Sequence, residues 1–186
     1  MRSIVQLIAL ALALQTAGCA PPLYRAELLD SAAHAPYTLA SGDRLRIIVF
    51  GQDSLSNSYS VDGSGNIAMP LIGSVHAVGQ STQSLERAIE AKLRDGFLRE
   101  PRVAAEVEAF RPFYIIGEVT TAGQYPFVNG MTVQNAIAIA GGFTPRGWNR
   151  GADVTRVING ETVTGTVPLT YMLRPGDTVT VRERFL

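Results

Sequence analysis

Short runs in which apolar and polar residues alternate recur along this chain, and they are typical of half-buried strands. Residues 44–50 are the clearest case, because Arg44 and Arg46 alternate with Leu45 and Ile47 before the run becomes fully apolar. Further strands are expected at 67–69, 75–78, 102–108, 113–119, 123–128, 153–158, 161–167 and 178–182. The turn-rich segment 62–66 is suited to a hairpin. Short strands of this kind predict a fold built mainly on sheets.

Two segments beyond residue 37 have helical signals. Residues 81–95 carry an apolar stripe at helical spacing, with Ser81 or Thr82 as the cap: Leu85, Ala88, Ile89 and Leu93. Residues 131–140 form a short apolar helix that Gly141 and Gly142 end. In the second half, two strands, a crossover helix and more strands follow one another, which is the order of a β-grasp. We therefore predict an α+β fold.

One motif occurs twice. Residues 41–47 and 175–181 each place a Gly-Asp pair before an alternating strand. Both are interpreted as turns in which Asp43 or Asp177 accepts hydrogen bonds from the following backbone. Gly42 and Gly176 are expected to adopt a positive φ. Neither carboxylate needs a catalytic role.

The N-terminus has the features of a secretory signal. Residues 4–14 are apolar except for Gln6, and this run is too short for a membrane span, which needs about 20 residues. Cys19, the only cysteine, follows small residues and resembles a bacterial lipobox, although Thr16 stands where Leu is usual. We expect residues 1–18 to be removed, Cys19 to be lipidated and residues 20–36 to be a tether. The alternative is a secreted protein with a free thiol.

The charge balance argues against nucleic acid as a partner. The chain has 16 Lys and Arg residues against 16 Asp and Glu residues. Binding to a phosphate backbone requires an excess of positive charge on one surface.

The order of motifs resembles a known family. Residues 37–50 contain Tyr37-x-Leu39-x-x-Gly42-Asp43, and residues 61–75 contain Met69-Pro70-Leu71-Ile72-Gly73. Both look like the polysaccharide-export domain of Wza-type outer-membrane export lipoproteins. Residues 116–125 and 140–144 then resemble an SLBB domain, a β-grasp unit. The resemblance implies a small α+β export domain at 37–110 and an SLBB domain at 111–186.

That family resemblance also implies a function without bond chemistry. Larger members end in an amphipathic helix that helps to build the outer-membrane pore, whereas this sequence stops at Leu186 after one SLBB unit. We therefore expect an oligomeric ring that guides a capsular or extracellular polysaccharide outward. Its partners would be the polysaccharide, further copies of the chain and an inner-membrane co-polymerase. It would be anchored by lipid at the periplasmic face of the outer membrane. The alternative is a monomeric SLBB-type carbohydrate-binding lipoprotein.

Catalytic and metal sites are not expected. The chain has two histidines, His34 and His76, and neither accompanies a nucleophile motif. These ligands are too few for a metal site, and no cofactor motif has its required context. The segment 63–68 fits a dinucleotide fingerprint in spacing but precedes a strand rather than a helix. Asp and Glu are common in the chain, so counting residues alone does not exclude a pair of catalytic carboxylates of the glycosidase type.

One loop is a candidate for contact with a sugar. Arg146, Trp148 and Arg150 lie close together in the sequence. An indole can stack on a pyranose, and guanidinium groups can pair with anionic substituents. The competing interpretation, which we favour, places Trp148 at a domain or subunit interface.

Overall fold

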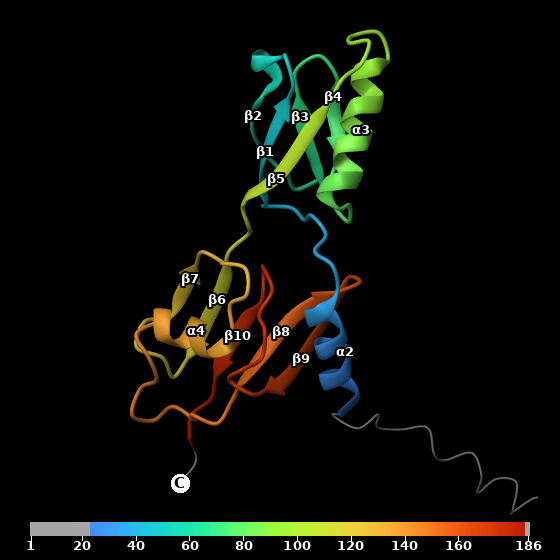
Figure 1. Cartoon of the computed structure of the whole chain (residues 1–186). Coiled ribbons are helices and arrows are strands. Elements are labelled where there is room, and N and C mark those ends of the chain that lie inside the picture. The colour runs from blue at the N-terminus through green and yellow to red at the C-terminus, as the bar shows by residue number, and fades with distance from the viewer. Residues whose placement is uncertain (1–22, 185–186) are drawn as a thin grey trace, which may run out of the picture.

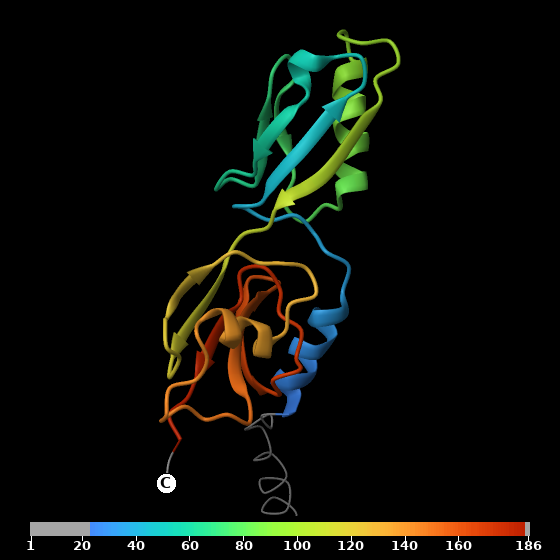
Figure 2. The ribbon, with the colours of Figure 1, turned by 60° about the vertical axis from the view of Figure 1, so that its left-hand side comes forward.

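Two separate hydrophobic cores divide the chain into two lobes (Figures 1 and 2). The computed structural model describes the backbone of residues 23–184 and the side chains of residues 29–184. The N-terminal lobe holds β1 to β5 and α3, and the C-terminal lobe holds α2, α4 and β6 to β10. The predicted α+β class is confirmed.

The N-terminal lobe contains two antiparallel sheets and one helix. The larger sheet has the order β2-β1-β5, with β1 at Arg44–Val49, β2 at Asn57–Ser60 and β5 at Val103–Ala109. The smaller sheet pairs β3, Asn66–Met69, with β4, Gly73–His76. A 3₁₀ turn, η1, covers Asp53–Leu55, and α3 covers Thr82–Arg94.

Helix α3 forms as its sequence predicts. Leu85, Ile89 and Leu93 are fully buried, and Ser81 accepts a hydrogen bond from the Ser84 N–H at 3.1 Å. The polar face of α3 also binds the edge strand β5, because two glutamates accept backbone N–H bonds at 2.8 and 3.0 Å: Glu86 from Ala105 and Glu90 from Val103. Helix side chains thereby pair edge groups that would otherwise lack partners.

The prediction that the strands on either side of 62–66 pair as a hairpin is wrong. Strand β2 pairs with β1, whereas β3 pairs with β4 across a turn at 70–72. Asp62 closes the 62–66 loop on itself by accepting the N–H groups of Ser64 and Asn66 at 2.8 and 2.9 Å. The loop therefore leads from one sheet to the other.

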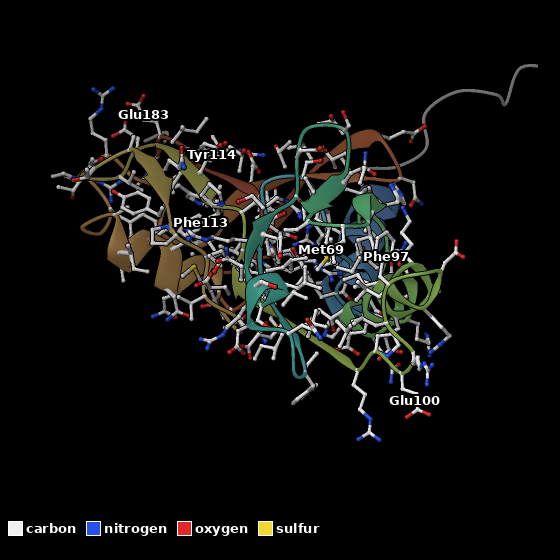
Figure 3. All side chains as sticks on the ribbon, turned by 90° about the horizontal axis from the view of Figure 1, so that it is seen from above. Met69, Phe97, Glu100, Phe113, Tyr114 and Glu183 are labelled. Carbon is white, nitrogen blue, oxygen red and sulfur yellow. The ribbon has the colours of Figure 1, made fainter. Side chains whose placement is uncertain are left out.

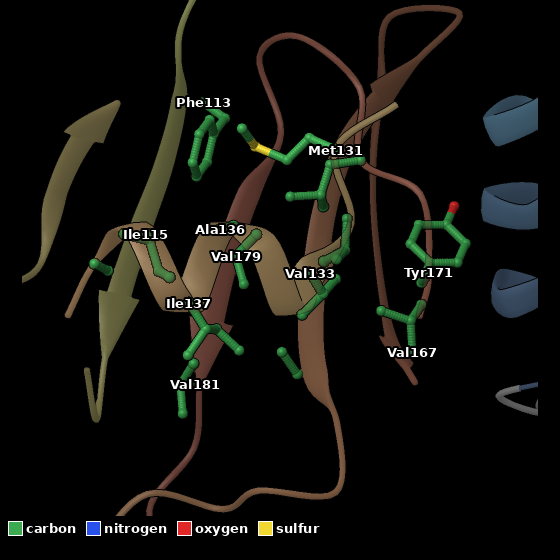
Figure 4. Close-up of a cluster of buried hydrophobic side chains, with 14 of the residues drawn as sticks. Phe113, Ile115, Met131, Val133, Ala136, Ile137, Val167, Tyr171, Val179 and Val181 are labelled. Atoms are coloured by element: carbon green, nitrogen blue, oxygen red, sulfur yellow. The ribbon is translucent and has the colours of Figure 1, made fainter. Parts of the chain in front are cut away.

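The C-terminal lobe is a mixed sheet crossed by one helix. Its strand order is β7-β6-β10-β8-β9, with β10 parallel to β6 and all other pairs antiparallel. The strands cover Phe113–Gly117 (β6), Gly123–Tyr125 (β7), Ala152–Ile158 (β8), Glu161–Val167 (β9) and Thr178–Val181 (β10). Helix α4, Val133–Ile139, buries its apolar side on this sheet (Figure 4). This is the expected β-grasp arrangement.

The expectation that 20–36 is only a tether is wrong. Residues Leu23–His34 form helix α2, which packs along β9 of the C-terminal lobe (Figures 1 and 2). Leu29 is fully buried in that lobe's core. The segment lacks an amphipathic pattern, so its helix depends on tertiary contacts that periodicity does not reveal.

The outer face of the five-stranded sheet remains uncovered within the described chain. Tyr114 and Ile116 of β6 are 43% and 47% exposed, and Val157 of β8 is 67% exposed. Tyr114 projects outward beside buried Phe113 (Figure 3). Threonines of β8, β9 and β10 occupy the positions between these apolar side chains.

Candidate functional site at the junction between the lobes

The two Gly-Asp turns meet where the lobes join. Gly42 and Gly176 have φ values of +92° and +85°, as predicted for these turns. Asp43 and Asp177 are both fully buried. Such burial of a carboxylate requires strong hydrogen-bond partners.

The carboxylates bind the preceding backbone, not the following backbone that we expected. Asp43 Oδ2 accepts the Ala40 N–H at 2.9 Å, and Asp177 Oδ2 accepts the Arg174 N–H at 2.8 Å. In both turns the aspartate N–H also donates to the carbonyl three residues earlier, at 3.1 Å. Each aspartate therefore closes the turn that leads into its strand.

Asp43 connects the two lobes. Its Oδ1 accepts the backbone N–H of Arg111 at 3.0 Å and lies 3.9 Å from Arg111 Nη1. The Tyr37 hydroxyl donates to Oδ2 of the same carboxylate. Burial, and then this hydrogen bond, raise the pKa of Tyr37 above its ordinary value.

Asp177 pairs instead within the C-terminal lobe. Arg156 donates to its two oxygens at 2.8 and 2.7 Å, in a bidentate arrangement. Arg156 also donates to the Leu29 carbonyl at 3.2 Å and the Tyr171 hydroxyl at 3.1 Å. Burial alone would lower the pKa of Arg156, but the hydrogen bonds and charge of Asp177 raise it. This pair joins α2, β8 and the Gly176-Asp177 turn.

A third guanidinium has no carboxylate bound to it among the described residues. Arg174 donates to the backbone carbonyls of Ala32 and, at 3.3 Å, Pro36. Burial lowers the pKa of Arg174, and the positive charge of Arg156 lowers it further. Arg111 lies at the same turn. Its Nε is so close to Gly176 that a Cβ built on this glycine, two residues after Arg174, would be 2.5 Å from it.

Two adjoining cavities open at this junction. One has a volume of about 300 Å³ and is lined by all three arginines, Arg111, Arg156 and Arg174. The other, of about 240 Å³, is lined by Tyr37, Phe110 and Phe127, among others. These rings stack edge to face, with centroids 5.0 Å apart for Tyr37 and Phe110 and 5.6 Å apart for Phe110 and Phe127. Fixed guanidinium groups beside apolar walls can bind an anionic ligand.

Sequence reasoning found the two aspartates of the junction but missed its arginines. One signal was available for Arg156. In β8 it occupies the same face as Ala152 and Val154, both fully buried. A cation on the apolar side of an alternating strand indicates a buried ion pair.

The structure separates the members of the predicted sugar-binding loop. Arg146 is exposed and paired with Glu183, whereas Trp148 is half-buried and its backbone N–H donates to the Arg182 carbonyl at 2.9 Å. The six-membered ring of the indole lies against Gly151. Arg150 is exposed. Contact between a sugar and this loop stays a prediction.

Neither histidine lines the two junction cavities. His34 contacts the Asp30 carbonyl at the end of α2, and His76 contacts Asn66 in the small sheet. Among the described residues, no group of three or more His, Cys, Asp or Glu side chains could hold a metal ion. Cys19 lies outside those residues.

The helices of residues 23–184 include none that is both long and apolar enough to span a membrane.

Comparison with known proteins identifies both lobes. Residues 31–108 match the model of polysaccharide biosynthesis/export proteins, and residues 112–167 match the SLBB domain. The fold is thus an export-type α+β domain followed by an SLBB domain. The chain belongs to the polysaccharide biosynthesis/export protein family.

Two relatives are full proteins of greater length. The exopolysaccharide production protein ExoF of Rhizobium meliloti is 32% identical over 118 residues, which are 57% of this chain and 28% of that protein. The polysialic acid transport protein KpsD of Escherichia coli is 28% identical over 142 residues, or 73% of this chain and 25% of KpsD. The chain therefore spans only about a quarter of each relative's length.

Proposed function

We propose that this chain is a non-enzymatic component of polysaccharide export that assembles into a homo-oligomeric ring and guides the polymer across the cell envelope. The observation that carries the proposal is the serial match of an export domain and an SLBB domain. The relatives are named for exopolysaccharide production and for polysialic acid transport. Moving a polymer needs a shaped surface and partner subunits, and no bond need be broken.

The exposed sheet face supports self-assembly. Tyr114, Ile116 and Val157 present apolar surface on a face that no described helix covers. Several exposed apolar side chains on one uncovered sheet face favour an interaction surface. In a ring, this face would pack against the neighbouring copy.

The location follows from the same proposal. Lipidation at Cys19 would attach the protein to the periplasmic face of the outer membrane, as expected from its lipobox. An inner-membrane polysaccharide co-polymerase would be the second partner.

Oligomer size and export test the proposal together. A strain lacking the gene should stop exporting its polymer, and the wild-type gene should restore export. The purified, detergent-solubilised protein should have the native mass of a large homo-oligomer. Ile116→Glu should reduce both the mass and the export, whereas Phe97→Glu, at an exposed site on the other lobe, should change neither. A wild-type protein that is monomeric at all concentrations and binds sugar would favour the carbohydrate-binding lipoprotein instead.

A further inference from the structure

The arginine-lined cavity at the junction carries an unbalanced positive charge. Three of its lining residues are arginines, and none of its described lining residues is acidic. Arg156 is neutralised by Asp177, and Arg111 lies beside Asp43. The charge of Arg174 has no such partner in the described chain, so the junction retains about one net positive charge.

Arg174 also has donors to spare. A guanidinium carries five N–H groups, and the described contacts of Arg174 use one on Nη1 and one on Nη2. Both contacts are to backbone carbonyls, which leave the positive charge in place. A carboxylate could therefore accept further hydrogen bonds from Arg174 without displacing α2 or Pro36.

The volume and the other lining residues of the cavity fit a sugar ring rather than a small inorganic anion. Its volume of about 300 Å³ is at the lower end of ligand pockets and is far more than one phosphate would fill. Pro36 and Pro175 offer apolar surface, while Thr38 and Asn159 offer polar groups. A pyranose has the matching combination of C–H faces and hydroxyl groups.

We propose that this cavity binds a carboxylated sugar unit, whose carboxylate pairs with Arg174. The proposal rests on the proposed function, since a polymer in transit would supply that unit. It assigns a preference for acidic polysaccharide to the junction between the lobes, not to the loop at 146–150.

Matched sugars test the proposal on the purified full chain. Calorimetry would compare methyl glucuronide with methyl glucoside, which differ only in the carboxylate, and would include the methyl glycoside of sialic acid and inorganic phosphate. At least one carboxylated glycoside should bind ten times more tightly than methyl glucoside. That ratio corresponds to about 1.4 kcal/mol. No preference of this kind with either acid sugar would overturn the proposal, and so would phosphate binding as tight as the sugar.

Variants locate the binding site. Arg174→Gln should remove the tenfold preference, whereas Arg87→Gln, the same change at an exposed position of α3, should retain it. If Arg174→Gln is poorly folded by circular dichroism, Arg174→Lys keeps the charge but loses the planar fork, and it should bind several times more weakly than the wild type. An unchanged preference in a folded Arg174 variant would overturn the assignment.

Export separates the two proposals. If gene deletion blocks export but the wild-type protein has no preference for the carboxylate, the export function stands and the cavity proposal fails. If the preference exists but deletion leaves export intact, the export function fails instead.

Discussion

Asp43 and Asp177 occupy equivalent turns, yet their charges are balanced in different ways. Asp177 has a bidentate partner inside its own lobe, and both members of that pair are almost fully buried. Asp43 instead shares its carboxylate among a tyrosine, a turn N–H and the backbone of Arg111. One turn therefore stabilises a lobe, while the other also fixes the position of one lobe against the other.

Removing the charge of Asp177 should destabilise the C-terminal lobe strongly. Asp177→Asn keeps the shape but leaves Arg156 buried without a counter-charge, which costs about 3–5 kcal/mol. Urea unfolding followed by circular dichroism would measure the loss. Asp53→Asn, at an exposed position, makes the same chemical change and should cost much less. Similar midpoints for the two variants would contradict the role of the pair.

Tyr37 should make the fold sensitive to alkaline pH. Its pKa is raised above the ordinary value of 10.0 by burial and then by Asp43. The folded state therefore retains the phenol proton when the unfolded state has lost it. The stabilisation is fully present below about pH 10 and is lost as the pH rises toward the folded pKa.

The comparison uses Tyr37→Phe, which has no proton to lose. Between pH 9 and 11 its urea midpoint should fall less steeply than that of the wild type. Some slope should persist, because burial also raises the pKa values of Tyr59 and Tyr171. Tyr114→Phe, at a residue that is 43% exposed, should follow the wild type, and equal slopes in all three proteins would refute the prediction.

The sequence predicts the backbone of single turns but not the distant partners of their side chains. Gly42 and Gly176 could be predicted, because a turn before a strand restricts its own backbone. The partner of each aspartate could not, because Arg111 lies 68 residues from Asp43 and Arg156 lies 21 from Asp177. Local patterns carry no information about such distant contacts.

Among the elements, the helices show the same limit. Helix α3 has both a cap and an apolar stripe, and α4 has a cap and a terminal glycine pair, so local signals predict both. Helix α2 has neither a stripe nor a predicted cap, so its sequence alone predicts only a tether. It is held by the burial of Leu29 and by the bonds of Arg156 and Tyr171 to the Leu29 carbonyl.

Truncating Leu29 tests whether α2 is part of the fold. Leu29→Ala should lower the free energy of unfolding by about 2–5 kcal/mol, because it removes a fully buried side chain from a packed core. Leu71→Ala, at a site that is 61% exposed, is the matched control and should change little. A tether would tolerate both substitutions equally.

On the scale of the whole molecule, the path of the chain links the two lobes twice. Helix α2 precedes the N-terminal lobe in sequence but packs on the C-terminal lobe. The chain therefore crosses between the lobes at 35–43 and again at 110–112 (Figure 2). Asp43 and Arg111 lie on these two crossings and are joined there. The site that we propose for an acidic sugar lies beside both crossings, so a bound sugar would contact residues of both.

Helix α2 also determines which lobe an anchor at Cys19 would hold. Leu23, four residues after that cysteine, begins the helix that packs on the C-terminal lobe. A lipid on Cys19 would therefore keep this lobe close to the membrane and leave no long free linker.

Cys19→Ser should abolish metabolic labelling with palmitate and leave the uncleaved precursor, because a lipobox cysteine is both the modified residue and part of the processing signal. Cys19 is the only cysteine, so no second thiol could take the label. Ser3→Ala, before the apolar run at 4–14, is the control and should be labelled and processed normally. Palmitate incorporation in the Cys19→Ser protein would show that the chain is not anchored as we propose.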